Sequence, residues 1–136
     1  MLVYYSHAMA TYGTEIENTE KQQILQNLPN ATLVDPGSYR DNPKKLNDGI
    51  GYCLNLVEKC DALSFTRFSG KITAGVGLEI NHALTKNKPV YELKKGKLRI
   101  VKKPVKHLSR DDTNALYRLC RSRELIKKLR SHSKHH

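Results

Sequence analysis

Short apolar runs and helical patterns alternate along the first hundred residues of the chain. The runs are brief, rich in strand-forming residues and bounded by Gly, Pro or polar residues, which predicts strands at 2–5, 32–34, 62–65, 89–93 and 98–101. Helical spacing and end signals predict helices over 14–28, 43–57 and 78–85. Such alternation calls for a mostly parallel five-stranded sheet with helices on both faces, the α/β class.

Two of these helices carry recognisable start signals. Thr14, followed by Glu17, fits a capping box, and Asn42-Pro43 places proline in a first helical turn, where it is tolerated. After Pro43 the apolar residues recur at helical spacing, which predicts one continuous helix with a single face on the core. The apolar positions of that face are Leu46, Ile50, Cys53, Leu54 and Val57.

Charge divides the chain into two parts. Residues 1–93 carry a net charge of −1 and residues 94–136 carry +12, so the basic character belongs to the C-terminal third. Ser109 with Asp112 three residues later predicts a final basic amphipathic helix over 109–130. We therefore expect an α/β domain over 1–108, this helix, and a disordered His-rich tail over 131–136.

The cysteines point to a reducing compartment. Cys53, Cys60 and Cys120 are odd in number and form no Cys-x-x-Cys, so neither a disulfide framework nor a zinc site is indicated, and we expect no metal or cofactor. The N-terminus lacks a signal-peptide pattern, and no apolar run reaches the roughly 18 residues of a membrane span. The sequence therefore predicts a cytoplasmic protein without a membrane partner.

Ligands of open α/β sheets bind beyond the carboxyl ends of the strands, which narrows the candidates for a site. The residues that follow the predicted strands or open the next helix are Ser6, His7, Asp35, Arg67, Glu92 and the segment 75–79. Asp35 stands in an Asp-Pro-Gly sequence, which favours a turn over a ribose contact.

The segment Gly75-Val76-Gly77-Leu78-Glu79 is the most informative of these. We expect a glycine loop over 73–77, in which Gly75 and Gly77 let the backbone turn tightly and let a ligand approach closely. Glu79 would then lie in the first turn of the next helix, where the helix dipole favours a carboxylate, as a nucleophile requires. The alternative is an ordinary loop followed by a helix with an acidic first turn.

Several segments together resemble a known family. They are Tyr4-Tyr5-Ser6-His7-Ala8, Cys60-Asp61-Ala62-Leu63, Gly75-Val76-Gly77-Leu78-Glu79-Ile80-Asn81-His82-Ala83 and Lys88-Pro89-Val90. Over residues 2–93 the chain resembles the nucleoside 2-deoxyribosyltransferases and their smaller relatives, the 2'-deoxynucleoside 5'-phosphate N-hydrolases. The resemblance implies a flavodoxin-like three-layer sandwich, an enzyme acting on a nucleoside or nucleotide, and a homo-oligomer.

The resemblance also assigns roles to residues. Glu79 matches the nucleophile that attacks the anomeric carbon in a two-step retaining reaction, and Tyr4 matches the tyrosine that holds it in position. Cys53 stands where the family usually carries an aspartate that assists the base or the sugar, so protonation of the leaving base must come from elsewhere or the activity is altered. His7 stands where relatives often have glycine.

The remaining candidates have both a binding and an ordinary interpretation. His7 is a candidate acid or phosphate contact, and the alternative is a satisfied loop histidine. Arg67 is a candidate for holding a 5'-phosphate with its guanidinium, and the alternative is a solvated arginine. Ser6 offers a hydroxyl donor to such a group or simply ends its strand.

The basic C-terminal segment supports a second function class. Its final helix carries Arg118, Arg121, Arg123, Lys127, Lys128 and Arg130 outside the apolar stripe. The alternative to an enzyme is a nucleotide- or nucleic-acid-binding module that contacts phosphates non-specifically through residues 94–130. Hydrolysis of other N-ribosides ranks lower, because the chain lacks the Pro-Gly-Gly sequence of the cytokinin-activating relatives.

Overall fold

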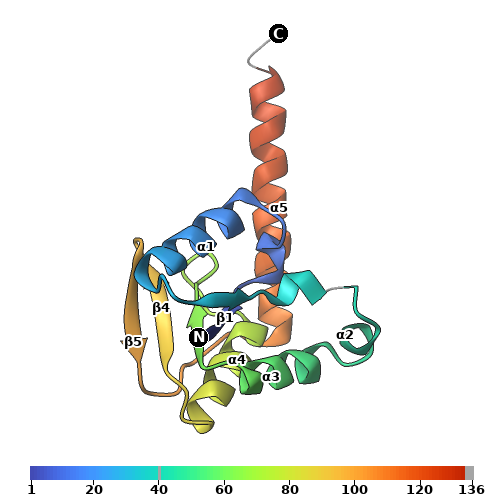
Figure 1. Ribbon diagram of the computed structural model, residues 1–136. Coiled ribbons are helices and arrows are strands. Elements are labelled where there is room, and N and C mark those ends of the chain that lie inside the picture. Colours follow the sequence, from blue (N-terminus) through green and yellow to red (C-terminus); the bar gives the residue numbers. More distant parts are fainter. Residues whose placement is uncertain (40, 134–136) are drawn as a thin grey trace.

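The protein is a mixed α/β structure built on one five-stranded sheet, as seen in a computed structural model that describes residues 1–39 and 41–133 (Figure 1). The strands are β1 (Leu2–Ser6), β2 (Thr32–Val34), β3 (Ala62–Phe65), β4 (Val90–Lys94) and β5 (Lys97–Val101). They lie in the order β2-β1-β3-β4-β5. All neighbouring pairs are parallel except the β4–β5 hairpin, so the predicted mostly parallel five-stranded sheet is confirmed.

Helices cover both faces of this sheet (Figure 1). The main helices are α1 (Glu15–Asn27), α3 (Gly49–Lys59) and α4 (Ala74–Thr85), with short helices η1 (Met9–Thr11), η2 (Pro36–Tyr39) and α2 (Pro43–Asn47) in the connections. The core divides accordingly. Tyr4, Leu63 and Phe65 pack with α3 and α4 on one face, whereas Tyr5 packs with Ile24 of α1 on the other. Consecutive residues of β1 therefore serve opposite layers.

The helix predicted over 43–57 is two helices, so that prediction is wrong. Asp48 ends α2 and caps α3, accepting a hydrogen bond from the backbone N–H of Gly51 at 3.2 Å. Leu46 and Ile50 are 71% and 41% exposed, and only Cys53 and Val57 of the expected stripe are buried. The side-chain cap competes with helix continuation at this point, and periodicity alone does not reveal it.

Two predicted helix starts also differ from the structure. The Thr14 side chain donates to the carbonyl of Thr11 at 2.6 Å instead of capping α1, so the capping box with Glu17 is wrong. Helix α4 begins at Ala74, four residues before the predicted start, and both glycines lie inside its first turn. Glu79 consequently lies in the second turn of α4 and not in the first, where the dipole acts most strongly.

The chain ends in the long helix α5 (Arg110–Ser133), whose C-terminal half projects away from the sheet (Figure 1). It begins as predicted, with the Ser109 hydroxyl accepting the N–H of Asp112 at 3.0 Å. The helix continues three residues past the predicted end, and positions 134–136 of the expected disordered tail lie outside the described residues. Among the described residues, no helix is both long and apolar enough for a membrane crossing.

Candidate active site

A buried carboxylate lies above the carboxyl ends of the central strands. Glu79, on α4, is 5% exposed, and each of its carboxylate oxygens accepts a hydrogen bond from β1. The Tyr4 hydroxyl donates to Oε2, and the Ser6 hydroxyl donates to Oε1 at 2.7 Å. Two hydroxyl donors thus fix the carboxylate, which is the arrangement that a positioned nucleophile needs.

The strand geometry explains why these three residues meet. Tyr4 and Ser6 alternate along β1, so both side chains point to the face that α4 covers. β1 lies between β2 and β3, and the chain passes from β3 through a loop into α4. The structure therefore brings together three of the predicted site residues at the edge where ligands of such sheets bind.

The tyrosine of this group remains a hydrogen-bond donor. Burial raises the pKa of the Tyr4 phenol, and the charge of Glu79 and the proximity of Cys53 raise it further. The phenol therefore keeps its proton at neutral pH and well above it, and it can donate to the Glu79 carboxylate there. Cys53, at the position where the resembling family carries an aspartate, accordingly lies beside the hydroxyl of Tyr4.

A second tyrosine, which sequence reasoning missed, borders the site. Burial raises the pKa of Tyr12, and the charge of Glu79 and the proximity of Cys53 add to the effect. The ring of Tyr12 lies 4.8 Å from the ring of His7, and it would contact a Cβ placed on Gly37. Tyr12 thus stands between the Glu79 carboxylate and a polar cluster on the opposite face of β1. Its Tyr-Gly turn in the sequence was the only local signal.

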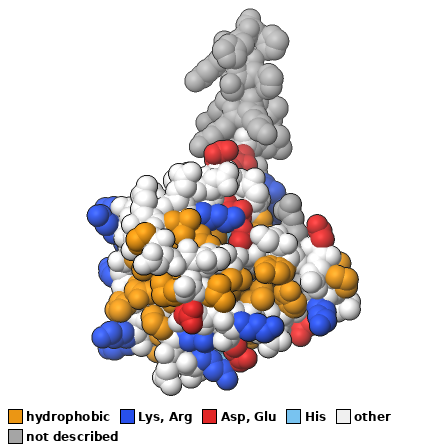
Figure 2. All heavy atoms as spheres, viewed as in Figure 1, with side chains coloured by type: hydrophobic (Ala, Val, Ile, Leu, Met, Phe, Trp, Pro, Cys, Tyr) orange, Lys and Arg blue, Asp and Glu red, His pale blue; other side chains and the backbone are white. Residues whose placement is uncertain are grey.

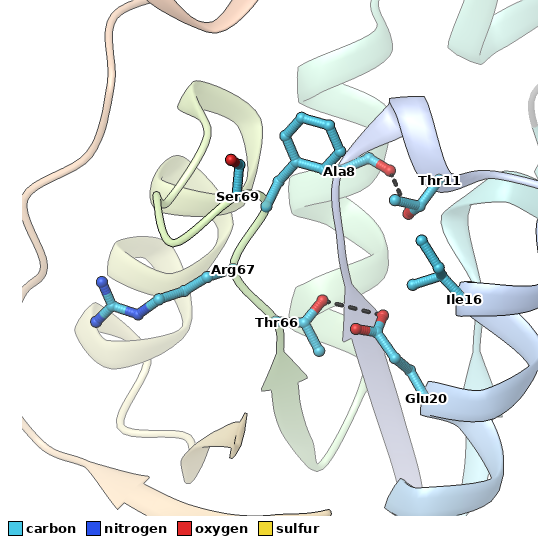
Figure 3. Close-up of a pocket in the computed structure, with 8 residues that line it drawn as sticks. Ala8, Thr11, Ile16, Glu20, Thr66, Arg67 and Ser69 are labelled. Atoms are coloured by element: carbon cyan, nitrogen blue, oxygen red, sulfur yellow. Dashed lines mark hydrogen bonds between the residues drawn. The ribbon is translucent and has the colours of Figure 1, made fainter. Parts of the chain in front are cut away.

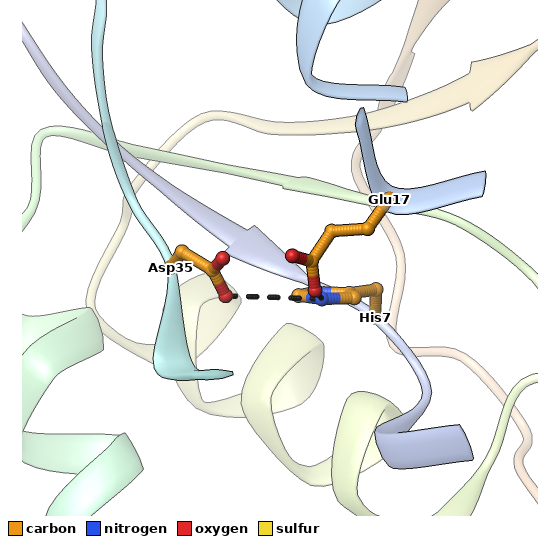
Figure 4. A group of neighbouring side chains, drawn as sticks. All are labelled: His7, Glu17 and Asp35. Atoms are coloured by element: carbon orange, nitrogen blue, oxygen red, sulfur yellow. Dashed lines mark hydrogen bonds and ion pairs between the residues drawn. The ribbon is translucent and has the colours of Figure 1, made fainter. Parts of the chain in front are cut away.

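That polar cluster contains His7, which is buried and lies beside Glu17 of α1 and Asp35 (Figure 4). His7 stacks on Tyr5 and therefore lies on the α1 face of β1, whereas Glu79 lies on the face that α4 covers. Its Nε2 lies 2.8 Å from Glu17 Oε2 and 3.8 Å from Asp35 Oδ1. Lys21 completes the group, with Nζ 2.6 Å from Asp35 Oδ2. Asp35 also accepts the N–H of Gly37 at 2.8 Å, so it makes the expected turn.

Arg67 follows β3, as predicted, and lies in an ion pair. Its Nε is 2.8 Å from Glu92 Oε2, and Arg99 approaches the other oxygen of the same carboxylate at 3.3 Å. A cavity of about 170 Å³ opens beside Arg67, between the ends of β1 and β3, where Thr66 donates to Glu20 at 3.1 Å (Figure 3). The guanidinium of Arg67 points away from Glu20 (Figure 3).

The two predicted glycines have different surroundings. Gly75 is exposed, and a Cβ there would meet nothing within 4 Å. A Cβ on Gly77 would lie 2.2 Å from the ring of His107, in the segment that joins β5 to α5. The absence of a side chain at Gly77 is therefore explained by packing of this segment against α4.

The start of α5 packs against the first turn of α4 and against the loop that follows β3. The Thr113 hydroxyl accepts the N–H of Ala74 at 2.9 Å, which caps the first turn of α4. One turn later, the ring of Tyr117 meets Phe68 edge to face at 5.3 Å. Thr113 and Tyr117 were not candidates at the sequence level, because nothing local indicates that the final helix packs on the loops beside Glu79.

Comparison with known proteins adds no assignment. No family model, no curated protein and no solved structure matches this chain. The resemblance to the nucleoside 2-deoxyribosyltransferases therefore stays a prediction based on the sequence segments that carry it.

Proposed function

We propose that the protein cleaves or transfers the N-glycosidic bond of a nucleoside or nucleoside 5'-monophosphate, with Glu79 as the nucleophile. The observation that carries the proposal is the Glu79 carboxylate, buried at the carboxyl edge of the sheet with one hydroxyl donor on each oxygen. The strand order is that of flavodoxin-like sheets, in which ligands bind at the β1/β3 crevice.

The proposed reaction has two steps. A Glu79 oxygen bonds to the anomeric carbon while the carbon–nitrogen bond breaks, and the leaving base takes that electron pair and a proton from water. Water or a second base then bonds to the same carbon and loses a proton, and the carboxylate of Glu79 is released. Tyr4 and Ser6 hold the carboxylate at the angle that both steps require.

Arg67 is the proposed contact for a 5'-phosphate. Glu92 binds the Nε side of its guanidinium, which orients the terminal nitrogens of a side chain that is 43% exposed. A guanidinium presents two parallel donors to phosphate oxygens, whereas a lysine presents a point charge. Arg67→Lys is therefore expected to weaken the use of 5'-monophosphates more than that of free nucleosides.

The experiment is incubation with deoxynucleosides, ribonucleosides and their 5'-monophosphates, followed by chromatography for free base. We expect base from at least one compound and none above background with Glu79→Gln. The matched control is Glu58→Gln, which removes an exposed carboxylate of α3 paired with His82 of α4 and with Lys86 at the end of α4, and which should leave the rate unchanged. Undiminished release by Glu79→Gln overturns the proposal.

A second candidate function rests on the exposed arginines of α5. Arg118, Arg121 and Arg123 are all exposed on this helix. On the face shown in Figure 2, by contrast, Lys and Arg side chains are scattered and interrupted by hydrophobic and acidic ones. In this candidate function, the three arginines of α5 contact the phosphates of a nucleic-acid backbone, with an affinity that decreases steeply with salt.

Charge substitution tests this second candidate better than truncation, because Thr113 ties α5 to α4. A mobility shift with single-stranded and duplex probes is measured for the full chain and for a variant with Arg118, Arg121 and Arg123 changed to Gln. The candidate predicts weaker binding by the variant and a shallower salt dependence. Equal binding by both proteins contradicts it.

A further inference from the structure

Three metal-ligating side chains from separate elements converge on the α1 side of β1. His7 follows β1, Glu17 lies in the first turn of α1, and Asp35 follows β2 (Figure 4). One ligand atom from each lies within 4.8 Å of the others, and all three residues are more than nine-tenths buried. Buried carboxylates that converge on an imidazole nitrogen need positive charge between them.

The His7 ring is held as a metal ligand usually is. Its Nδ1 bonds to the carbonyl oxygen of Tyr5 at 3.0 Å, and its ring stacks on that of Tyr5 at 3.7 Å with an angle of 4°. Histidines that bind metals commonly donate their second nitrogen to a backbone carbonyl, which fixes the ring and aims the other nitrogen. Here Nε2 is aimed at Glu17 and Asp35.

Lys21 supplies positive charge to the same group. Its Nζ lies 2.6 Å from Asp35 Oδ2 and 3.4 Å from Glu17 Oε1. This ammonium lies beside both carboxylates, whereas Nε2 of His7 faces them from the other side. A single divalent ion would balance the charge of the two carboxylates, and the Lys21 side chain, 30% exposed, reaches the surface into which it would withdraw.

We propose that His7, Glu17 and Asp35 form a binding site for a divalent transition-metal ion, for which Lys21 is a built-in competitor. One imidazole nitrogen and two carboxylate oxygens suit Zn²⁺, Mn²⁺ or Fe²⁺ better than Mg²⁺. A cavity of about 230 Å³, lined by Glu17, Lys21, Asp35 and Tyr12 among others, adjoins the ligands and offers room for water or another oxygen donor. The site does not depend on the reaction proposed at Glu79.

The test is calorimetric titration of the metal-stripped full chain with Zn²⁺, repeated with Mn²⁺. Because histidine is a common zinc ligand, every protein in this test, the parent included, carries His132, His135 and His136 changed to Ala. We expect one equivalent to bind, His7→Ala to weaken binding at least about tenfold, and Lys21→Met to tighten it. The matched control is His82→Ala, which removes a partly exposed histidine paired with Glu58 and should leave binding unchanged.

The competing explanation, a salt-bridge network alone, makes the opposite predictions. The proposal is overturned if no saturable binding is seen, if His7→Ala binds as well as the parent, or if only Lys21→Met binds metal. In the last case the Lys21 ammonium, and not a metal ion, would be the cation that balances the two carboxylates in the native protein. Circular dichroism checks that His7→Ala is folded. If it is not, Glu17→Gln decides, since it keeps the shape and the hydrogen-bonding capacity of the side chain while removing one charge.

Discussion

The hydroxyl groups of β1 determine what the Glu79 carboxylate can do. Tyr4→Phe removes the donor to Oε2 and leaves a buried oxygen without that partner. We expect base release to fall by about tenfold or more, as for the loss of one oriented donor in other active sites, and stability to fall by about 1–3 kcal/mol. The measurements are kcat, KM and the free energy of unfolding in urea.

Tyr5→Phe is the matched control for this substitution. The hydroxyl of Tyr5 donates to Glu20 on the opposite face of the same strand, so the control loses a comparable hydrogen bond while the stacking on His7 is retained. The account predicts a loss of stability without loss of base release. Equal loss of activity in the two variants would show that Tyr4 acts only through stability.

A pH-dependent contribution to stability comes from the Glu92 carboxylate. Burial raises its pKa, but the hydrogen bonds and charges of Arg67 and Arg99 outweigh burial, so the pKa of Glu92 lies below its usual value. A carboxyl group with a lowered pKa in the folded state stabilises the protein above its unfolded pKa and loses that contribution as pH falls through the folded value.

Glu92→Gln therefore has a pH-dependent effect on unfolding. We expect the variant to be less stable by about 1 kcal/mol at pH 7 and the difference to shrink as the pH falls below about 4. Urea unfolding at a series of pH values gives this difference directly. A difference that is constant from pH 3 to pH 7 would contradict the role of the two arginines.

At the scale of elements, most of the secondary structure could be predicted from the sequence and most of the contacts could not. The strands are short apolar runs between turn residues, so their positions follow from the local sequence pattern. The break at Asp48 depends on a side-chain cap, and the early start of α4 places glycines in a helix that they disfavour. The first outcome is decided by a local cap that periodicity does not report, and the second by the packing of α5 and the preceding segment against α4.

The candidate site was predictable only in part, for the same reason. Tyr4, Ser6 and Glu79 could be placed at one sheet edge because strand alternation and strand ends fix their directions. The pairing of His7 with Glu17 depends on how α1 packs, and no periodicity reports it. Tyr12 and Thr113 belong to a loop and to the last helix, whose approach to the site is visible only in three dimensions.

Substitutions at the two glycines of α4 distinguish a glycine needed for packing from a glycine needed for the approach of a ligand. Gly77→Ala would place a Cβ 2.2 Å from the His107 ring, so we expect this variant to have a lower melting temperature than the parent. Adding His107→Ala to it should restore part of the loss. In Gly75→Ala the new Cβ meets nothing within 4 Å, and alanine favours a helix interior by about 1 kcal/mol over glycine. We therefore expect this variant to be at least as stable as the parent. Thermal unfolding of the three variants measures this.

The outcome at Gly75 also bears on binding. A Gly75→Ala variant that is as stable as the parent but binds or converts substrate poorly would support close approach of a ligand at this backbone. A variant with unchanged activity would leave Gly75 with no role in the site. A Gly77→Ala variant as stable as the parent would contradict the packing of the 102–109 segment against α4.

At the scale of the whole molecule, α5 is part of the structure around Glu79. Its first turns cap α4 through Thr113 and contact Phe68 through Tyr117. We expect Thr113→Val, which keeps the shape but removes the hydroxyl, to destabilise the protein by about 1 kcal/mol, the usual cost of losing a helix cap. Urea unfolding compares it with Thr85→Val, which removes an exposed hydroxyl at the other end of α4. Equal losses would contradict the capping role.

The same packing changes the meaning of the basic C-terminal third. The net charge of +12 lies in a segment that contributes a cap and an aromatic contact to the domain, so it is not a separable appendage. Apart from Arg110 at its first position, the exposed arginines of α5 begin at Arg118, one residue after the last of these contacts. One helix therefore supports the site with its first turns and presents charge beyond them.

The central claim is that Glu79 forms a covalent bond to the sugar. Acid quenching during turnover of a deoxynucleoside that releases base, followed by mass spectrometry of the digested protein, tests it most directly. The account predicts one deoxyribosyl group on the peptide that contains Glu79, and none in Glu79→Gln. Base release by the parent protein that persists in Glu79→Gln, with no adduct on this peptide in either protein, would contradict it.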